Sequence, residues 1–169
     1  ITDAFEERFR MIFDALKEKH PEIVVVGTAG PFIRGTDYVE GWDIARRIGL
    51  PIIDEHYYVR PGWFIHHQDF YDKYPRDCGT KIYAGEYAAH RPDRRAVVET
   101  ALAEAMHLIN VERNGDLVKM TSYAPLFAKV GYAQWNPDLI YFTNSEVLPT
   151  PGYEVQKLFG CNSGSEYLA

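Results

Sequence analysis

The sequence lacks the features that mark several common classes of protein. Its two cysteines, Cys78 and Cys161, lie far apart without metal-type spacing, which indicates neither a disulfide framework nor a zinc site. No basic run accompanies the net charge of −6, so neither nucleic acid nor an anionic membrane surface is expected as a partner. No apolar stretch approaches the roughly 20 residues that span a bilayer. The amphipathic segment Thr2–Lys17 carries too many charges for a signal peptide, and the chain is expected to be soluble.

A phosphate-binding loop of recognised form is also missing. The segment Gly27–Gly30 follows an apolar run, but it lacks a third glycine and is followed by Pro31. Nucleotide binding is therefore not expected, and we expect no other cofactor.

What the sequence does contain is an alternation of strand-like and helix-like stretches. Its 169 residues, of which 46% are apolar, are enough to form one domain with a sizeable core. Apolar runs predict strands at 23–27, 51–58, 81–87 and 117–123, and a last short strand or loop at 139–142. The first of these runs is apolar on both faces, which is typical of a buried parallel strand.

Helical spacing predicts an opening helix and further helices near 38–48, 63–74 and 95–111, with a short one that Pro151 opens. The helix at 95–111 has the clearest pattern, and its predicted apolar side consists of Val98, Ala101, Leu102, Ala105, Met106 and Ile109.

The strands begin about 30 residues apart, which is the size of a strand plus a crossover helix. Such βα units suit a small open α/β sheet or part of a (β/α)8 barrel, which typically has about 250 residues. Polar residues end three of the strands, with Asp54 and His56, then Glu86, then Ser122 and Tyr123. Because parallel strands present their carboxyl ends at one side, where barrel enzymes hold their chemistry, this placement favours the barrel.

Glu86 is the residue with the clearest chemical meaning. It ends a strand between small residues, in Ala84-Gly85-Glu86-Tyr87-Ala88, where a carboxylate is reachable from solvent. Glycosidases use such a group as nucleophile, but glycoside hydrolysis normally needs two carboxylates. The alternative is a structural role, in which Glu86 caps the next helix or pairs with an arginine such as Arg94.

Several other polar residues have a structural alternative. Asp54, Glu55 and His56 together suggest a metal site, but consecutive strand residues point to opposite faces, so Glu55 cannot readily join the other two and no metal is expected. In the pair His66-His67, helical geometry favours a partly buried His67 and a solvated His66. Asp138 either holds a substrate hydroxyl or makes a structural bond in its turn.

Five segments, in order, resemble glycoside hydrolase family 51, the α-L-arabinofuranosidases. They reach from about residue 50 to about residue 160 and comprise Asp54–Val59, Ala84–Ala88, Val111–Asn114, Met120–Phe127 and Trp135–Phe142. The resemblance implies a (β/α)8 catalytic barrel with the acid/base on strand four and the nucleophile on strand seven. It also implies double displacement with retention, on arabinose-containing polysaccharides or oligosaccharides such as arabinan or arabinoxylan.

The resemblance makes Glu86 the nucleophile and places His56 and Tyr58 beside the sugar. Either of these two could donate a hydrogen bond to Glu86 or hold a sugar hydroxyl. Trp135 and Tyr123 offer flat faces on which a furanose or the next sugar could stack. Where the family has a glutamine near the strand-eight turn, this chain has Asn136-Pro137, and Asn136 is the candidate contact there.

The resemblance also explains the missing second carboxylate. The family's acid/base lies in a Gly-Asn-Glu motif at the end of strand four, which does not occur here. We therefore expect residues 1–160 to form strands five to eight of the barrel and 161–169 to lead towards an absent β-sandwich. Such a chain is expected to be inactive alone. Alternatively, it is a non-catalytic carbohydrate-binding remnant, or two copies pair as a homo-oligomer because open strand edges invite pairing. Its compartment stays open, with a periplasmic or secreted location favoured.

Overall fold

A four-stranded parallel sheet forms the centre of the computed structural model, which describes residues 3–168. Its strands follow the chain order β1-β2-β3-β4, and every neighbouring pair is parallel. The bounds are Val26–Thr28 for β1, Ile52–Val59 for β2, Lys81–Ala89 for β3 and Val118–Tyr123 for β4. The predicted mixed α/β class with parallel βα units is therefore confirmed.

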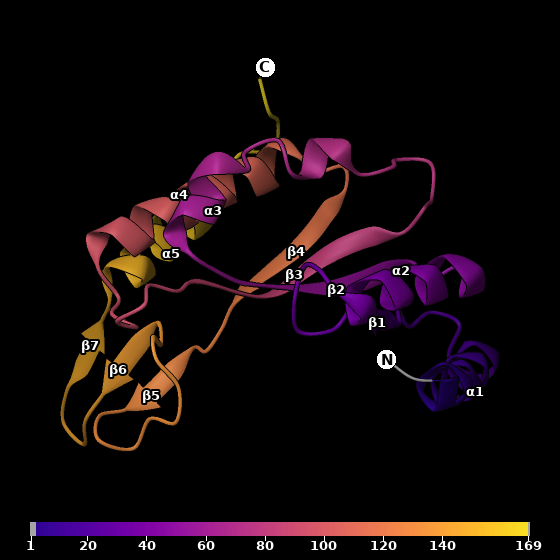
Figure 1. The fold of residues 1–169 in the computed structure, drawn as a ribbon, viewed down its shortest axis with the longest axis horizontal. Coiled ribbons are helices and arrows are strands. Elements are labelled where there is room, and N and C mark those ends of the chain that lie inside the picture. The colour runs from indigo at the N-terminus through magenta and orange to yellow at the C-terminus, as the bar shows by residue number, and fades with distance from the viewer. Residues whose placement is uncertain (1–2, 169) are drawn as a thin grey trace.

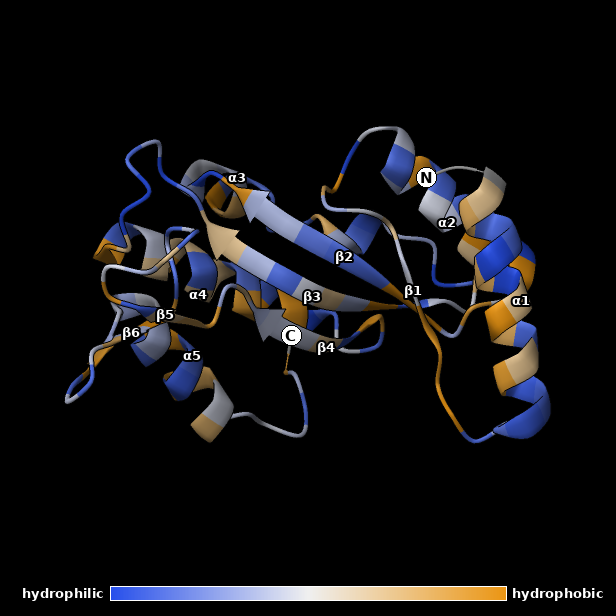
Figure 2. Cartoon of the chain, turned by 90° about the horizontal axis from the view of Figure 1, so that it is seen from below, coloured by the Kyte–Doolittle hydropathy of each residue, from blue (hydrophilic) through white to orange (hydrophobic). Residues whose placement is uncertain are grey.

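Helices separate the strands along the chain. They are α1 (Asp3–Lys19), α2 (Thr36–Ile48), α3 (Pro61–His66), α4 (Val98–Arg113) and α5 (Pro151–Cys161), with a 3-10 turn η1 (Tyr71–Lys73) before β3. Figure 1 shows α3, α4 and α5 together above the sheet, and Figure 2 shows β2 and β3 from the opposite side, in front of these helices. Among residues 3–168, no helix is long and apolar enough to cross a membrane.

A second, three-stranded sheet follows β4 and lies apart from the first (Figure 1). It consists of β5 (Phe127–Lys129), β6 (Ile140–Phe142) and β7 (Val147–Pro149) in the order β5-β6-β7. The sequence pattern predicts β6 alone, as a short strand or loop. All three strands have three residues each, which is too short for an alternating pattern to be recognised, and only the apolar run at 139–142 indicated β6.

The core is an aromatic layer between the sheet and the helices α3 and α4. Tyr57, Phe64, Tyr71 and Tyr87 are fully buried, and the rings of all four surround His107 of α4 at centroid distances from 4.8 to 6.1 Å. Burial without a charged partner lowers the pKa of His107 to about 3, so this histidine is neutral and packs as an aromatic ring.

Two predicted apolar faces differ from the observed ones. In α4, Val98, Leu102 and Ile109 are each more than half exposed, whereas Glu104 and His107 are buried. The buried side of the helix consists mainly of small and polar residues together with Leu108, and three of the large apolar residues point outward. The predicted buried strand at 23–27 is also wrong in part. Ile23 and Val24 are exposed, and β1 begins only at Val26, which pairs with Ile52, the first residue of β2. Among the described strands, β1 is an edge strand that pairs with β2 alone.

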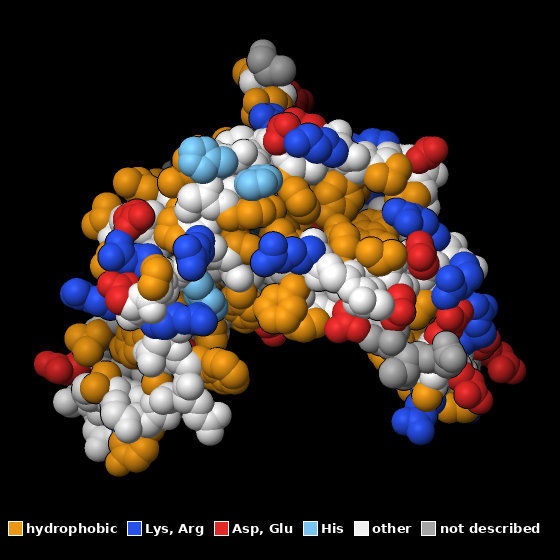
Figure 3. Space-filling model, in the orientation of Figure 1, with side chains coloured by type: hydrophobic (Ala, Val, Ile, Leu, Met, Phe, Trp, Pro, Cys, Tyr) orange, Lys and Arg blue, Asp and Glu red, His pale blue; other side chains and the backbone are white. Residues whose placement is uncertain are grey.

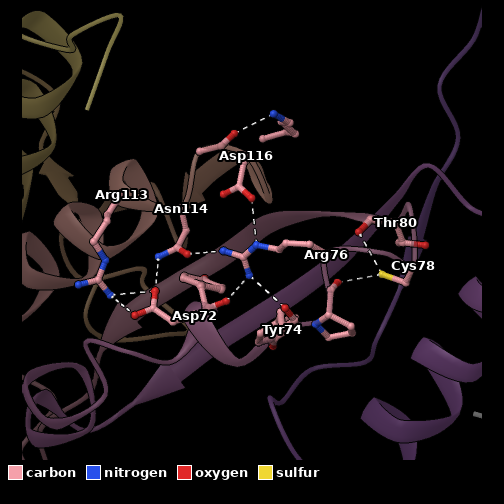
Figure 4. A network of polar contacts seen from close by, with 12 residues as sticks. Asp72, Tyr74, Arg76, Cys78, Thr80, Arg113, Asn114 and Asp116 are labelled. Carbon is pink, nitrogen blue, oxygen red and sulfur yellow. Dashed lines mark hydrogen bonds and ion pairs between the residues drawn. The ribbon is translucent and has the colours of Figure 1, made fainter. Parts of the chain in front are cut away.

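A polar network anchors the loop that precedes β3 (Figure 4). The Arg76 guanidinium donates to the Asn114 side chain at 2.6 Å and to Asp116 at 2.9 Å, both in the turn that joins α4 to β4. Arg113 pairs with Asp72 of η1 at 2.9 Å. These contacts fix the start of β3 against the start of β4, and so hold the strand that carries Glu86.

The molecule has the form of an arch (Figure 3). The body formed by the parallel sheet and its helices spans the top, and the β5-β6-β7 sheet and α1 extend downward at its two ends (Figure 1). On α1, Phe9 and Phe13 pack against the core, while Met11 and Ile12 are exposed.

Candidate active site

A local irregularity in the sheet brings Glu86 level with His56. Along β2 and β3, Glu55 pairs with Ala84, and the next pair is His56 with Glu86. Gly85 is therefore an extra residue on β3, a bulge of the kind that re-aims a side chain next to an active site. The bulge lies close to the carboxyl end of the sheet, where the sequence predicts the chemistry.

Two side chains from β2 contact the Glu86 carboxylate. The Tyr58 hydroxyl donates to Glu86 Oε2 at 2.6 Å, and His56 Nδ1 lies 3.2 Å from the same oxygen. The Glu86 side chain is nevertheless 40% exposed. A carboxylate oriented from one side and open on the other has the form that a nucleophile requires.

Asp54 contacts both His56 and the backbone next to Glu86. Its Oδ2 lies 2.9 Å from Nε2 of His56, and its Oδ1 accepts the backbone N–H of Gly85 at 3.1 Å. A Cβ on Gly85 would lie 2.0 Å from Asp54 Oδ1, so a side chain there would have to displace the Asp54 carboxylate from its present position. The small residue before Glu86 thus makes room for the carboxylate that orients His56.

His56 stands between two carboxylates, and this decides its charge. Burial lowers the pKa of His56, but the hydrogen bond to Asp54 and the charges of Asp54 and Glu86 outweigh it, so the pKa is raised. Only the protonated imidazole can donate from both nitrogens at once. When it is protonated, His56 places a positive charge beside Glu86.

Glu55 points to the other side of the sheet, as the strand geometry predicts. It is fully buried and accepts from Trp42 Nε1 at 2.7 Å, from the Tyr74 hydroxyl at 3.0 Å and from the Tyr57 hydroxyl. Burial raises its pKa against the effect of these donors. Glu55 is thus a core residue and takes no part in the Glu86 site.

A cleft of about 660 Å³ opens over Glu86. Each of the four strands, or the loop behind it, contributes to its wall, as expected at the carboxyl side of a parallel sheet. The described residues that line it are Pro31, Phe32, Tyr58, Glu86, His90, Arg94, Ala124, Pro125, Trp135 and Asn136.

The structure brings most of the predicted site residues together. Trp135, which is 71% exposed, and Asn136 line the cleft with Tyr58 and Glu86, and His56 contacts Glu86. Tyr123 is not brought there. It packs edge-to-face on Tyr87 at 5.5 Å and is not among the described lining residues.

The structure also shows the surroundings of the residues for which a purely structural role was considered. Arg94 contacts His90 and not Glu86, so the ion pair considered for Glu86 is not seen. His67 is partly buried and stacks on Trp63 at 4.6 Å, whereas His66 is exposed, as predicted. Asp138 is buried and its backbone N–H donates to the Tyr141 hydroxyl at 3.0 Å, which fits a structural bond in the turn.

Six lining residues were not predicted as site residues, and the three of them with large aromatic or charged side chains are Phe32, His90 and Arg94. They lie on loops behind β1 and β3, where no hydrophobic period exists to indicate which way a side chain points. One signal was available, since both loops follow the carboxyl end of a parallel strand.

Comparison with known proteins identifies the family to which the chain belongs. Residues 79–169 match the family model for the α-L-arabinofuranosidase C-terminal domain. The chain is 40% identical, over 99% of its length, to an extracellular exo-α-L-arabinofuranosidase of Streptomyces chartreusis, and 32% identical, over 97%, to α-L-arabinofuranosidase 1 of Arabidopsis thaliana. An arabinose-bound family 51 α-L-arabinofuranosidase superposes with a TM-score of 0.81 over 98% of the chain, at 30% identity.

The chain forms a parallel α/β sheet with an oriented carboxylate in a cleft at the carboxyl side of the strands. Together with the matching family model, these features define a glycoside hydrolase domain. More narrowly, the chain belongs to the α-L-arabinofuranosidase C-terminal domain family, within glycoside hydrolase family 51. It spans only 20% and 23% of the length of the two curated relatives named above, and 27% of the structural one.

Proposed function

We propose that this chain is the nucleophile-bearing half of a retaining α-L-arabinofuranosidase, with β1 to β4 as strands five to eight of a (β/α)8 barrel. The observation that carries the proposal is the Glu86 carboxylate, oriented by Tyr58 and His56 and open to a cleft. The in-order parallel strands and the concave arch support the barrel assignment.

In the proposed reaction, Glu86 attacks the anomeric carbon of a terminal arabinofuranosyl group. The bond to the leaving oxygen breaks as an acid protonates it, and an ester forms between Glu86 and the sugar. Water then attacks that ester while the same acid group acts as a base, so the configuration is retained. Tyr58 and protonated His56 keep the Glu86 oxygen aimed until the ester forms, and one of them can then hold a sugar hydroxyl.

The acid/base is proposed to come from another part of the longer protein. Asp54 is the other carboxyl group that contacts His56, but Gly85 N–H binds one of its oxygens and His56 the other. A retaining pair requires a second carboxyl group about 5 to 5.5 Å from the first, facing the substrate. Asp54 is instead the group that orients His56.

The substrate class is proposed from the relatives and from the cleft. Arabinose-containing polysaccharides or oligosaccharides, such as arabinan or arabinoxylan, would present a side-chain arabinose to Glu86 while Trp135 provides an aromatic face for a neighbouring sugar. A secreted location is proposed from the extracellular Streptomyces relative. We further propose that residues 161–169 lead towards a β-sandwich domain.

The proposal has a direct test in the full-length protein. Glu86→Ala should abolish turnover of 4-nitrophenyl α-L-arabinofuranoside, and added azide should restore it with an inverted arabinosyl azide as product. Undiminished activity of the variant would rule out the nucleophile role. The 169-residue chain alone should release no 4-nitrophenol whatever its oligomeric state, since pairing two copies duplicates Glu86 and supplies no acid/base.

A further inference from the structure

Arg94 stands in an unusual position at the edge of the cleft. It lies in the loop between β3 and α4, lines the cleft with Glu86, and is exposed. Its backbone has φ +54°, the single positive value among the described residues other than glycine. A residue with a Cβ pays a modest cost for this left-handed conformation. The loop therefore holds Arg94 in a defined orientation at the cleft.

The guanidinium of Arg94 has no acidic partner among residues 3–168. Its hydrogen bond is to Nδ1 of His90, a neutral acceptor whose pKa burial and the Arg94 charge lower to about 4. Nearby Arg91, by contrast, pairs with both Asp93 and Glu99. The positive charge of Arg94 thus remains available to a ligand in the cleft.

A chain of contacts also places Arg94 relative to the proposed nucleophile. Glu86 accepts from the Tyr58 hydroxyl, the Tyr58 ring stacks on His90 at 5.1 Å with an interplanar angle of 19°, and His90 accepts from Arg94. Two aromatic rings therefore separate the charge from the reacting carboxylate. Arg94 is therefore placed to meet a different part of a ligand in the cleft from the part that Glu86 would attack.

We propose that Arg94 recognises the carboxylate of a uronic acid residue in the glycan from which arabinose is released. This inference rests on the proposed function, because it names the substrate class of the same cleft. A guanidinium binds a carboxylate through two parallel N–H groups, and a neutral hydroxyl would leave its charge unmatched. The chain has a net charge of −6 and Glu86 lies in the same cleft, so an acidic glycan needs a local cation to approach.

The test compares two substrates that differ only in charge. One is an arabinofuranosylated oligosaccharide that carries glucuronic acid on its backbone, and the other is the same compound with its carboxyl group reduced to an alcohol. The full-length enzyme should have a kcat/KM higher for the acidic substrate, on the order of fivefold, and the ratio should fall towards one at high salt.

Arg94→Gln removes the charge but retains a donor for His90, and should bring the ratio to about one. Arg95→Gln is the matched control, because Arg95 is the adjacent arginine and is not among the described lining residues. It should keep the wild-type ratio. Equal kcat/KM values in the wild type, an unchanged ratio in Arg94→Gln, or an equal loss in Arg95→Gln would overturn the proposal.

Binding separates this proposal from the proposed function. Calorimetry on the full-length Glu86→Gln protein should show tighter binding of the acidic oligosaccharide than of its reduced form, and the Arg94→Gln change should remove the difference. That readout needs no turnover, so it decides the role of Arg94 even if the protein proves not to hydrolyse arabinofuranosides. A wild-type enzyme that is active but binds both oligosaccharides equally would refute the role of Arg94 alone.

Discussion

The Tyr58 hydroxyl donates a hydrogen bond of 2.6 Å to Oε2 of Glu86, across two neighbouring strands. Burial and this bond to Glu86 raise the pKa of Tyr58, so the hydroxyl stays protonated as a donor. Tyr58→Phe should lower kcat/KM for an aryl arabinofuranoside by about 10- to 100-fold, because one oriented donor at the reacting carboxylate is lost.

Tyr83→Phe provides the matched control for that measurement. Tyr83 is also a strand tyrosine of the same sheet, but its hydroxyl bonds the Ser122 hydroxyl at 2.6 Å and does not touch Glu86. The control should retain nearly full kcat/KM. Equal losses in the two variants would mean that the Tyr58 effect arises from the sheet as a whole.

His56 should make stability depend on pH. Because its pKa in the folded protein is raised above the ordinary value of 6.5, its stabilising contribution is fully present below pH 6.5 and is lost as pH rises through the raised value. The melting temperature of the wild-type protein should therefore exceed that of His56→Gln at about pH 6, by a margin that shrinks towards about pH 9. A margin that is constant or grows with pH would show that protonated His56 is not what the two carboxylates bind.

A side chain at Gly85 should disturb the site, because Asp54 would have to move. An added Cβ would meet Asp54 Oδ1 at 2.0 Å and push away the carboxylate that orients His56. Gly85→Ala should destabilise the fold by about 2 to 4 kcal/mol and lower kcat at least about tenfold.

Gly160→Ala is the comparison for that variant. A Cβ added to this residue of α5 would have no atom within 4 Å, so alanine should be neutral there or stabilise the helix by up to about 1 kcal/mol. Thermal melting and steady-state kinetics measure both effects. A Gly85→Ala enzyme as stable and active as Gly160→Ala would contradict the close packing of Asp54.

Glu104 should add a second pH dependence of stability. It lies beneath β3, accepts the Ala89 N–H at 3.0 Å, and has a pKa that burial raises from 4.5 to about 7. Its stabilising contribution is fully present below pH 4.5 and is lost as pH rises through about 7. The stability of the wild type relative to Glu104→Gln should fall over this range by at most about 3 kcal/mol.

Glu99→Gln offers a surface control on the same helix. Glu99 is exposed and pairs with Arg91, so its loss should change stability by less than about 1 kcal/mol. A wild-type advantage over Glu104→Gln that stays level between pH 4.5 and 7 would show that Glu104 is not protonated in the folded protein.

Much of the fold could be predicted because its elements are long and periodic. The runs that became β2, β3 and β4 have six to nine residues each and fall at regular intervals, which indicated parallel βα units. The strands β5 and β7 have three residues each, and their pairing depends on contacts with β6 that no local pattern encodes. In α4, apolar residues occur all around the helix, so spacing alone placed Ala101 correctly but assigned the exposed Val98, Leu102 and Ile109 to the buried side.

The site residues likewise divide into those that the sequence could predict and those that it could not. His56, Tyr58 and Glu86 lie on strands, where alternation and register determine their direction. Alternation also explains Tyr123, since its neighbour Ser122 bonds Tyr83 while Tyr123 packs on Tyr87 on the other side. His90 and Arg94 lie beyond the end of β3, and only the folded loop shows that they face the cleft.

The most direct test of the nucleophile assignment is to trap the covalent intermediate in the full-length protein. A fluorinated arabinofuranosyl donor that forms the ester rapidly and hydrolyses slowly should inactivate the enzyme. Mass spectrometry of the digested protein should then find one fluorinated arabinosyl group on the peptide that contains Glu86, attached at that residue. A label on a different carboxylate, or continued turnover with Glu86 unmodified, would contradict the assignment.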